Sequence, residues 1–326
     1  MVCGTGSIGF RHLRVLRDSL QLKPVALPTR SSRISELDSK GFHAVSSWEI
    51  AAIDKPWFAV IATDTGRHLT DASKALELGA DVLIEKPIAA STEGLRELEE
   101  LAERVHRRVF VACNLRFDAG LKLFRSHLPD IGRVQSVRIE CQSFLPDWRP
   151  DTDYRRSYSA RAEEGGVLRD LIHEIDYALW LFGVPQNLFA KLKNTGALGI
   201  ASDESADILW ESPSGATVSI RLDYLARVTR RKMHAYGDLG ELEWDYVGKC
   251  VSLSQPGKAV QTWAIDQARD EMMSEQLAAF IGFAGTHIGS SLATLDEGAT
   301  AIAICDTARR SSQSGHVEVV PDWRRA

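Results

Sequence analysis

The stretch VCGTGSIGFRHLRVL, residues 2–16, places three glycines, Gly4, Gly6 and Gly9, in the spacing G-x-G-x-x-G. In such a turn the first glycine allows a tight bend, the second lets the backbone approach a pyrophosphate, and the third lets the following helix lie close to the strand. The N–H groups at the start of that helix can then bind the anion. The spacing alone is a weak indication of a dinucleotide-binding fold. Because the motif here opens a helix at the start of a domain, it predicts such a fold.

Strands and helices alternate beyond this turn as far as residue 114. The run 57–63 is almost entirely apolar, as expected for a strand covered on both faces. Alternation at this spacing predicts a doubly wound parallel sheet. The expected strands are 23–29, 57–63, 81–87 and 108–114, and the expected helices are 65–79 and the charged stretch after a cap at Ser91 or Thr92.

The segment before Gly4 contains only three residues, whereas a strand usually has about five. In a dinucleotide fold that first strand also lies centrally in the sheet. We therefore expect the natural chain to begin further upstream.

The end of the second expected strand bears on the choice of cofactor. NAD-binding folds place an acidic residue roughly 20 positions after the glycines, where it holds the ribose 2′-hydroxyl. Here that region reads PTRSSR, residues 28–33, and the next carboxylate is Glu36. Arg30 or Arg33, with serine hydroxyls such as Ser31, can instead bind a 2′-phosphate, although the same residues also suit an ordinary polar loop. We favour NADP(H) over NAD(H).

The length of 326 residues suggests about two domains. We expect a dinucleotide-binding domain over residues 1–115 and a second domain over residues 116–326, with the C-terminal helix packing back towards the first. After residue 116, β-rich runs separated by glycine-containing turns predict antiparallel hairpins.

Composition limits the possible partners and compartment. The net charge of −5 argues against a nucleic-acid partner. No apolar run approaches the roughly 20 residues of a membrane span, and the N-terminus does not read as a signal peptide. The five cysteines contain no CxxC pair, which suits reduced thiols and argues against a zinc site. We therefore expect a cytoplasmic protein without a metal, a nucleic acid or a membrane as partner.

Two further segments carry groups suited to proton transfer. The run GADVLIEKPIA ends a predicted strand with Glu85-Lys86-Pro87, and ligands bind at the carboxyl ends of parallel strands. A lysine there can donate to a substrate oxygen, although three such residues alone also fit a surface turn. The run GGVLRDLIHEIDYALWLFG, residues 165–183, predicts one helix with an apolar face. Its other face, typical of a solvated helix or a substrate site, carries Asp170, His173, Glu174, Asp176, Tyr177 and Trp180.

Residues 144–160, FLPDWRPDTDYRRSYSA, mix aromatic and charged side chains. Aromatic faces stack on sugar rings, and arginines bind carboxylates or phosphates. A solvated loop with anchoring aromatics is the alternative. If the cluster binds substrate, a sugar with an acidic group or a nucleotide-linked sugar is expected, with contacts from Trp148, Arg149, Tyr154 and Tyr158.

Taken together, these motifs resemble the glucose–fructose oxidoreductase/inositol dehydrogenase/rhizopine catabolism (Gfo/Idh/MocA) family. The resemblance spans the chain and includes GTGSIGFRHLR, ATDTGRH, GADVLIEKPIA, NLRF, the 165–183 stretch and DEMMSEQLAAFIGFAG. It implies an α/β fold in which an N-terminal Rossmann domain precedes an α/β domain built on a large, open, mostly antiparallel sheet. One face of that sheet would join subunits into a homodimer or homotetramer.

The resemblance also implies hydride transfer between NAD(P) and a hydroxyl or keto carbon of a sugar, acidic sugar, cyclitol or nucleotide sugar. Lys86 and His173 would act on the substrate oxygen with Asp170, which stands three residues before His173 where relatives commonly have four. Either spacing keeps the pair on one helical face. The residues expected to bind cofactor are Gly4, Thr5, Gly6, Ser7, Ile8, Gly9, Thr63, Asp64, Thr65, His68, Glu85, Lys86 and Asn114, and further substrate contacts are expected from Arg116 and Asp176.

Two alternatives stay open at this point. One is a non-catalytic regulator that binds a dinucleotide, against which the retention of Lys86 and His173 argues. The other is a glycosidase that oxidises and re-reduces its sugar on a retained NAD.

Overall fold

The computed structural model describes residues 1–162, 165–283 and 291–325. The chain divides into two units. Unit 1 comprises Met1–Phe117 and Ala268–Ala299, and unit 2 comprises Asp118–Gln267 and Thr300–Ala326. The first boundary lies close to the one expected after residue 115. The return of residues 268–299 to unit 1 differs from the expected second domain, which ran without interruption from residue 116.

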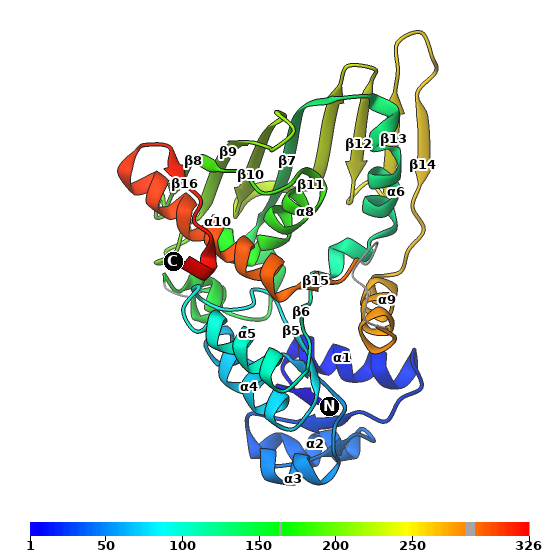
Figure 1. Cartoon of the computed structure of the whole chain (residues 1–326), viewed down its shortest axis with the longest axis vertical. Coiled ribbons are helices and arrows are strands. Elements are labelled where there is room, and N and C mark those ends of the chain that lie inside the picture. The colour runs from blue at the N-terminus through cyan, green and yellow to red at the C-terminus, as the bar shows by residue number, and fades with distance from the viewer. Residues whose placement is uncertain (163–164, 284–290, 326) are drawn as a thin grey trace. The chain divides into compact units, whose positions relative to one another are not determined.

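Unit 1 is built on a sheet with the strand order β15–β6–β5–β4–β1–β2–β3 (Figure 1). Strand β1 pairs in parallel with β2 on one side and β4 on the other. All four residues of β4 are buried, as its apolar sequence predicts. The strands are β1 (Val2–Cys3), β2 (Val25–Leu27), β3 (His43–Ala44), β4 (Phe58–Ile61), β5 (Asp81–Ile84), β6 (Val109–Val111) and the antiparallel β15 (Ala293–Thr294). The predicted doubly wound parallel sheet is confirmed.

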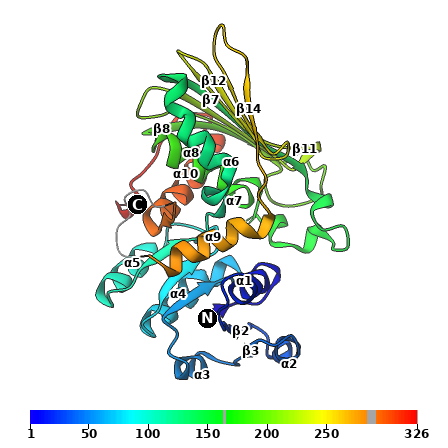
Figure 2. The same ribbon diagram turned by 90° about the vertical axis from the view of Figure 1, so that its right-hand side faces the viewer.

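The helices of unit 1 are α1 (Ser7–Asp18), α2 (Ile34–Ser39), α3 (Trp48–Ile53), α4 (His68–Glu77), α5 (Leu95–Arg104) and α9 (Arg269–Ile281). The cap of α5 is Gly94, with a φ of +80°, so the predicted cap at Ser91 or Thr92 is wrong. Helix α9 lies beside α1 (Figure 2). Its Phe280 ring meets Phe58 and Phe110 edge-on, at centroid distances of 6.0 and 5.9 Å. This aromatic packing explains why the chain returns to unit 1 after residue 267.

Unit 2 is built on a sheet with the strand order β14–β13–β12–β11–β7–β10–β9–β8–β16. Strands β7 and β10 are parallel, and the other described pairs are antiparallel, which confirms the expected mostly antiparallel sheet. The strands are β7 (Val134–Phe144), β8 (Asn187–Lys193), β9 (Ser205–Glu211), β10 (Thr217–Asp223), β11 (Leu225–Gly237), β12 (Glu241–Asp245), β13 (Cys250–Ser254), β14 (Gln261–Ala264) and β16 (Glu318–Val319).

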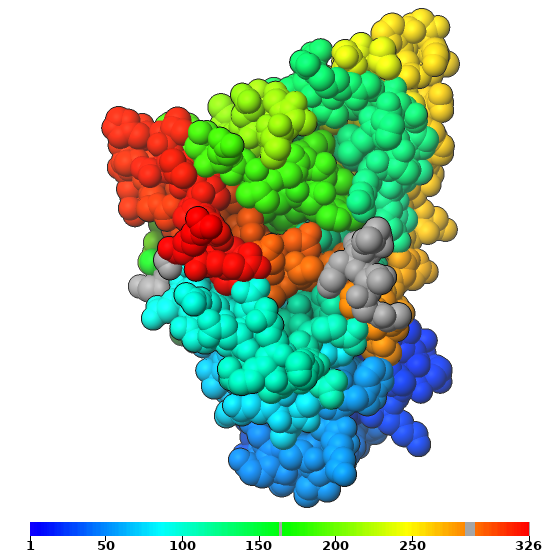
Figure 3. Space-filling view, in the orientation of Figure 1, coloured from blue at the N-terminus to red at the C-terminus, as the bar shows by residue number. Residues whose placement is uncertain are grey.

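Helices cover one face of the unit 2 sheet. Figures 1 and 2 show α6 (Ala119–His127), α8 (Ile172–Phe182) and α10 (Leu295–Ser314) on that face. Helix α10 begins in unit 1 and continues into unit 2, and the chain then ends in residues that form part of the surface in Figure 3. No helix in the described residues is long and apolar enough to cross a membrane.

The start of unit 2 is fixed by a buried aspartate. Asp118 caps α6 by accepting from the Leu121 N–H at 2.7 Å, and it also accepts from the Trp244 indole N–H at 3.0 Å. A Cβ added at Gly120 would lie 2.7 Å from that indole nitrogen, so only glycine lets α6 approach Trp244 so closely. Burial raises the pKa of Asp118. The hydrogen bonds thus hold a carboxylate that packing alone would disfavour.

Candidate functional site

The glycine turn after β1 contains two crowded positions and one open one. Gly4 has a φ of +84°, and a Cβ there would lie 2.5 Å from the Ala62 backbone. A Cβ at Gly9 would lie 1.9 Å from the Gly4 carbonyl oxygen. A Cβ at Gly6, in contrast, would meet nothing within 4 Å. Contacts within the protein therefore explain Gly4 and Gly9, whereas Gly6 leaves open the space that a pyrophosphate needs.

Helix α1 begins at this open position with properties that suit an anion. Its N-cap, Gly6, supplies no side-chain hydrogen bond, and the first turn carries no acidic residue. The first N–H groups of a helix have no partner within the helix, and its N-terminus carries a partial positive charge. Thr5 is buried, and Ser7 and Ile8 stand in the first turn. The predicted pyrophosphate-binding residues thus lie at the start of α1 or directly before it, and their contact with a dinucleotide remains a prediction.

The end of β2 presents an arginine and no ribose-binding carboxylate. Arg30 and Ser31 are exposed, and Arg30 makes no side-chain hydrogen bond or ion pair within the described ranges. Glu36 is engaged within its own helix, 2.6 Å from Lys40 and 3.4 Å from Arg33. Its hydrogen bond to Lys40, followed by the charge of Arg33, lowers the pKa of Glu36. The nearest carboxylate is therefore already committed to local cations.

The loop after β4 contains Thr63, Asp64 and Thr65. The Thr63 hydroxyl oxygen is buried and has no hydrogen-bond partner among the residues the structure describes, so a bound group can satisfy it. Asp64 is exposed, and Thr65 opens the short 3₁₀ helix η2 (Thr65–Arg67). His68, in contrast, is 2% exposed, with both ring nitrogens near backbone carbonyls. His68 therefore lies beneath the loop, and its contact with the cofactor remains a prediction.

The strand β5 leads directly into Glu85 and Lys86. Glu85 is 8% exposed, and its Oε1 lies 2.6 Å from Nε2 of His12, a buried residue of α1. Its other oxygen accepts from the Lys86 backbone N–H at 3.3 Å. Lys86 itself is half-buried and precedes a cis bond to Pro87. The Glu85 carboxylate thus faces α1, and no local pattern in the sequence indicates its partner His12, which lies 73 positions away.

Asn114 and Arg116 lie in the 3₁₀ helix η3 (Asn114–Phe117) after β6. In the orientation that satisfies its neighbours, the Gln276 amide oxygen accepts from the Cys113 and Asn114 N–H groups, each at 3.2 Å. Arg116 is 1% exposed and pairs with Glu297 at 2.8 Å. The Arg116 guanidinium is held in an internal ion pair, and its contact with substrate remains a prediction.

The 165–183 stretch forms two helices, so the prediction of one continuous helix is wrong. Helix α7 (Val167–Asp170) ends at Leu171, whose φ and ψ are −99° and 31°, and α8 follows. The Glu174 N–H bonds the Leu171 carbonyl, three residues back, where an unbroken α-helix would use Asp170. Asp170 and His173 therefore lie on different helices, so their spacing in the sequence does not place them on one helical face.

Most of the predicted polar face of α8 is buried. Glu174 and Tyr177 are 0% exposed, and Asp176 is 2% exposed. Glu174 lies 2.8 Å from Nε of Arg231 on β11, and the Tyr177 ring packs edge-on against Trp244 at 5.6 Å. Only His173 and Trp180 keep intermediate exposure among the polar and aromatic residues predicted on this helix. The role of Asp176 as a substrate contact remains a prediction.

Asp170 connects α7 to the aromatic loop after β7. It is 4% exposed and accepts from the Tyr224 hydroxyl at 2.5 Å. Burial, followed by the Asp170 charge, raises the pKa of Tyr224. The same two causes raise the pKa of the Tyr158 hydroxyl, although 38% of Tyr158 is exposed. Two tyrosines thus share the Asp170 carboxylate. No local pattern in the sequence indicates Tyr224, because it lies 54 positions from Asp170.

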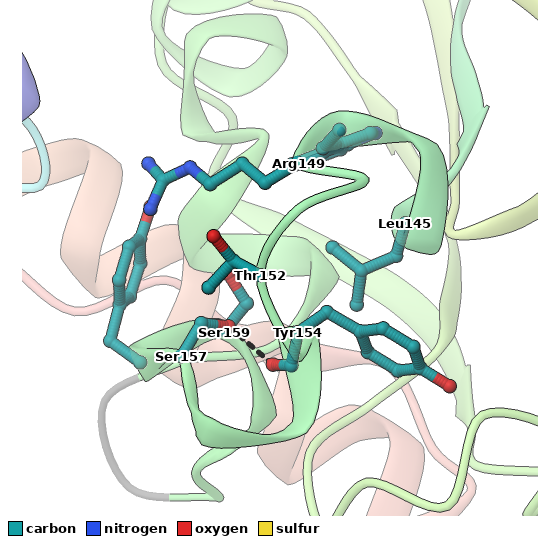
Figure 4. A pocket seen from close by; sticks show the side chains of 8 residues that line it. Leu145, Arg149, Thr152, Tyr154, Ser157 and Ser159 are labelled. Atoms are coloured by element: carbon teal, nitrogen blue, oxygen red, sulfur yellow. Dashed lines mark hydrogen bonds between the residues drawn. The ribbon is translucent and has the colours of Figure 1, made fainter.

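The predicted substrate residues Trp148, Arg149, Tyr154 and Tyr158 all line one pocket in unit 2. Figure 4 shows Arg149 and Tyr154 extending in opposite directions from the pocket loop. The polar edges of two rings are fixed: the Trp148 N–H donates to Ser143 Oγ at 2.8 Å, and the Tyr154 hydroxyl donates to the Leu198 carbonyl at 3.0 Å. Trp148 also meets Tyr224 edge-on at 5.4 Å. The pocket wall therefore continues into the Asp170 cluster.

The predicted catalytic residues belong to different units, Lys86 to unit 1 and Asp170 and His173 to unit 2. No group of three or more metal-binding side chains occurs among the residues that the structure describes.

Comparisons with known proteins bear on both units. A model of the GFO/IDH/MocA oxidoreductase family with an NAD-binding Rossmann fold matches residues 1–113, and a model of the GFO/IDH/MocA C-terminal domain matches residues 129–243. Myo-inositol dehydrogenase Hyg17 of Streptomyces leeuwenhoekii is 28% identical over 56% of this chain and 55% of its own length. The uncharacterized oxidoreductase YdgJ of Escherichia coli is 29% identical over 41% of this chain and 38% of its own length. The chain thus matches about a third to a half of these curated relatives.

Solved structures show the same fold over nearly the whole chain. Levoglucosan dehydrogenase in complex with NADH has a TM-score of 0.84 at 19% identity, covering 98% of each chain. UDP-N-acetylglucosamine 3-dehydrogenase GnnA from Acidithiobacillus ferrooxidans has a TM-score of 0.79 at 19% identity, covering 96% of this chain and 97% of that chain. At this identity the likeness shows the fold alone.

Proposed function

Since the chain belongs to the GFO/IDH/MocA oxidoreductase family with an NAD-binding Rossmann fold, we propose that it transfers a hydride between a nicotinamide dinucleotide and a hydroxyl or keto carbon of a sugar-like substrate. The observation that carries this proposal is the glycine turn. Gly4 and Gly9 are fixed by contacts within the protein, while Gly6 opens onto free space at the start of α1. Levoglucosan dehydrogenase, which has the same fold, has been solved in complex with NADH, and this supports a nicotinamide dinucleotide as the cofactor.

The chemistry divides between two side chains. When bound, the nicotinamide ring supplies or accepts the hydride. In the oxidative direction His173 takes the hydroxyl proton, because an imidazole with an ordinary pKa of about 6.5 suits proton transfer near neutrality. Lys86 donates a hydrogen bond to the same oxygen and stabilises its developing negative charge. Asp170, Glu85 and Asn114 orient these groups and the cofactor.

We favour NADP(H) as the cofactor. Arg30 is exposed and makes no side-chain ion pair within the described part of the chain, whereas Glu36 is paired with Lys40. An arginine fork binds a 2′-phosphate. Glu36, the carboxylate that could bind a 2′-hydroxyl instead, is already paired with Arg33 and Lys40. Substituting Arg30 with alanine should weaken NADPH binding and leave NADH binding nearly unchanged.

The substrate we favour is a sugar with a carboxylate or phosphate group. The pocket of Trp148, Arg149, Tyr154 and Tyr158 combines aromatic surface with a guanidinium, and Arg149 makes no side-chain ion pair among the described residues. The proposed partners beyond the substrate are further copies of this chain, bound through the open face of the unit 2 sheet, in the cytoplasm. The free cysteines, four of them buried, suit that compartment.

The test is turnover with NADPH and NADH over a panel of neutral sugars, acidic sugars, cyclitols and nucleotide sugars. We expect activity with at least one acidic or nucleotide-linked member, and a loss of about 10²- to 10⁴-fold in kcat for His173→Ala. The control is His43→Ala, an exposed histidine in unit 1. Tight dinucleotide binding with no turnover over the whole panel would overturn the proposal in favour of a regulator.

A further inference from the structure

Two buried histidines lie on either side of Lys86 in unit 1. His12, on α1, contacts the side chain of the preceding residue, Glu85. His68, the first residue of α4, contacts the carbonyl of the following residue, Pro87. His12 is 0% exposed and His68 is 2% exposed, so neither ring is placed to touch substrate. The backbone at Lys86 is thus held at both of its neighbours by side chains from two different helices.

The His12 contact ties Lys86 to the glycine turn. His12 Nε2 lies 2.6 Å from Glu85 Oε1, and a carboxylate only accepts, so Nε2 carries the proton. The second Glu85 oxygen accepts from the Lys86 N–H at 3.3 Å, and the Glu85 N–H donates to the Ile61 carbonyl at 2.8 Å. His12 stands three residues after Gly9 on the helix that the turn opens. Hydrogen bonds through Glu85 therefore join His12, in the middle of α1, to the Lys86 backbone.

The His68 contact ties Lys86 to the loop after β4. His68 Nδ1 lies 2.9 Å from the Pro87 carbonyl oxygen, and Nε2 lies 3.0 Å from the Thr63 carbonyl oxygen. Both oxygens only accept, so each contact needs a donated proton, and a neutral ring supplies one of the two. The ring links the Lys86 segment to Thr63, whose buried hydroxyl has no partner among the described residues.

We propose that His12 and His68 are positioning residues that set Lys86 relative to the dinucleotide-binding loops. The inference rests on the proposed role of Lys86 in hydride transfer. A purely structural role would need only that both rings fill their interior sites. A positioning role needs the particular hydrogen bonds, and it assigns the single proton of the neutral His68 ring to Nδ1, which donates to the Pro87 carbonyl, because Pro87 adjoins Lys86.

Two matched substitutions, His68→Asn and His68→Gln, can separate the contact of His68 with the Pro87 carbonyl from its contact with the Thr63 carbonyl. The asparagine amide nitrogen stands near the position of Nδ1, and the glutamine amide nitrogen stands near that of Nε2. His68→Asn therefore keeps a donor towards Pro87, and His68→Gln keeps one towards Thr63. For His12, His12→Gln keeps the donor to Glu85, and His12→Leu removes it. His43→Gln, on an exposed histidine of unit 1, is the control for the substitution itself.

The first readout is independent of catalysis and of substrate. Hydrogen exchange followed by mass spectrometry would measure amide protection in the peptide that covers residues 85–90 of the full-length protein. We expect His68→Gln and His12→Leu to increase the exchange rate of this peptide about fivefold, with His68→Asn and His12→Gln close to the wild type. Thermal unfolding identifies any variant that fails to fold. If one histidine's pair contains such a variant, the pair at the other histidine provides the comparison.

The second readout is kinetic. With an active substrate, His68→Gln and His12→Leu should lower kcat up to about 100-fold, because small displacements of a reacting group are costly, while the KM for the dinucleotide changes much less. Equal exchange and equal kcat in His68→Asn and His68→Gln would overturn the inference. If the wild type shows no turnover, the proposed function fails, whereas the exchange data still decide whether the histidines hold the Lys86 segment.

Discussion

At the residue scale, the glycines of the first turn serve different purposes. Gly9 has no room for a side chain, because a Cβ there would lie 1.9 Å from the Gly4 carbonyl oxygen. Gly6 has room, and its φ of −63° is one that any residue can adopt. The fold therefore requires glycine at position 9. At position 6 the fold would accept a side chain, and glycine is needed there only to leave space for the pyrophosphate.

This difference predicts opposite results for two alanine substitutions. Gly6→Ala should leave the melting temperature nearly unchanged, since a small gain from the stiffer unfolded chain opposes the poorer cap. It should weaken dinucleotide binding at least about tenfold, because the methyl group enters the pyrophosphate space. Gly9→Ala should lower the melting temperature markedly. Fluorescence titration with NADPH and thermal unfolding measure the two effects, and unchanged affinity in Gly6→Ala would contradict the assignment.

His68 makes stability depend on pH. Burial lowers its pKa below the ordinary 6.5, against the raising effects of the Thr63 and Pro87 carbonyls and the Glu85 charge. Below about pH 6.5, His68 binds a proton in the unfolded chain but stays neutral in the folded protein. The free energy of unfolding therefore decreases as the pH falls. Urea unfolding at pH 7.5 and 5.5 should show a smaller loss of stability in His68→Gln than in the wild type. An equal loss would show that other groups carry the dependence.

At the element scale, α8 is held against the unit 2 sheet by a buried ion pair. Glu174 is 0% exposed and lies 2.8 Å from Arg231 of β11, whose side chain is 20% exposed. Burial lowers the pKa of Arg231, but its interactions with Glu174, Cys141 and Tyr177 together outweigh burial, so the pKa is raised. Because His173 precedes Glu174, this pair also sets the start of the helix that carries the proposed base.

Breaking one side of the pair should cost more than removing both. Arg231→Met leaves a buried carboxylate uncompensated and should lower the free energy of unfolding by about 3 kcal/mol, the low end for such pairs because part of the arginine is exposed. Adding Glu174→Gln removes the charge and should recover part of that loss. Urea unfolding of Arg231→Met, Glu174→Gln and the double variant measures the three changes in the free energy of unfolding. A double variant as unstable as the sum of its single changes would contradict the coupling.

The sequence predicted features that depend on local backbone geometry, such as the glycine turn, the buried run of β4 and the start of unit 2 near residue 117. It failed where distant contacts decide. The helical periodicity continues through Leu171, so nothing in the sequence marks the break between α7 and α8. The partner of Glu85 lies 73 positions away and that of Asp170 lies 54 positions away. The partner of Arg116, Glu297, lies 181 positions away.

At the scale of the whole molecule, the uncovered face of the unit 2 sheet presents apolar cross-strand neighbours. Phe189 and Leu209 are direct partners on β8 and β9 and are 39% and 46% exposed. If this face joins copies of the chain, Leu209→Lys should lower the mass in solution to that of a monomer, because a charge would be buried at the interface. Val184→Lys, at an equally exposed valine, is the control. Light scattering with size-exclusion chromatography gives the mass, and an unchanged mass for Leu209→Lys would count against the proposed interface.

The polypeptide crosses from one unit to the other three times, after Phe117, after Gln267 and within α10 after Ala299. A gene fragment that stops at Phe117 would therefore encode a dinucleotide lobe deprived of the Phe280 ring that its aromatic cluster needs. Recombination with a relative at a single junction would leave one lobe incomplete, so chimaeras of this architecture need three crossover points, one of them inside a continuous helix.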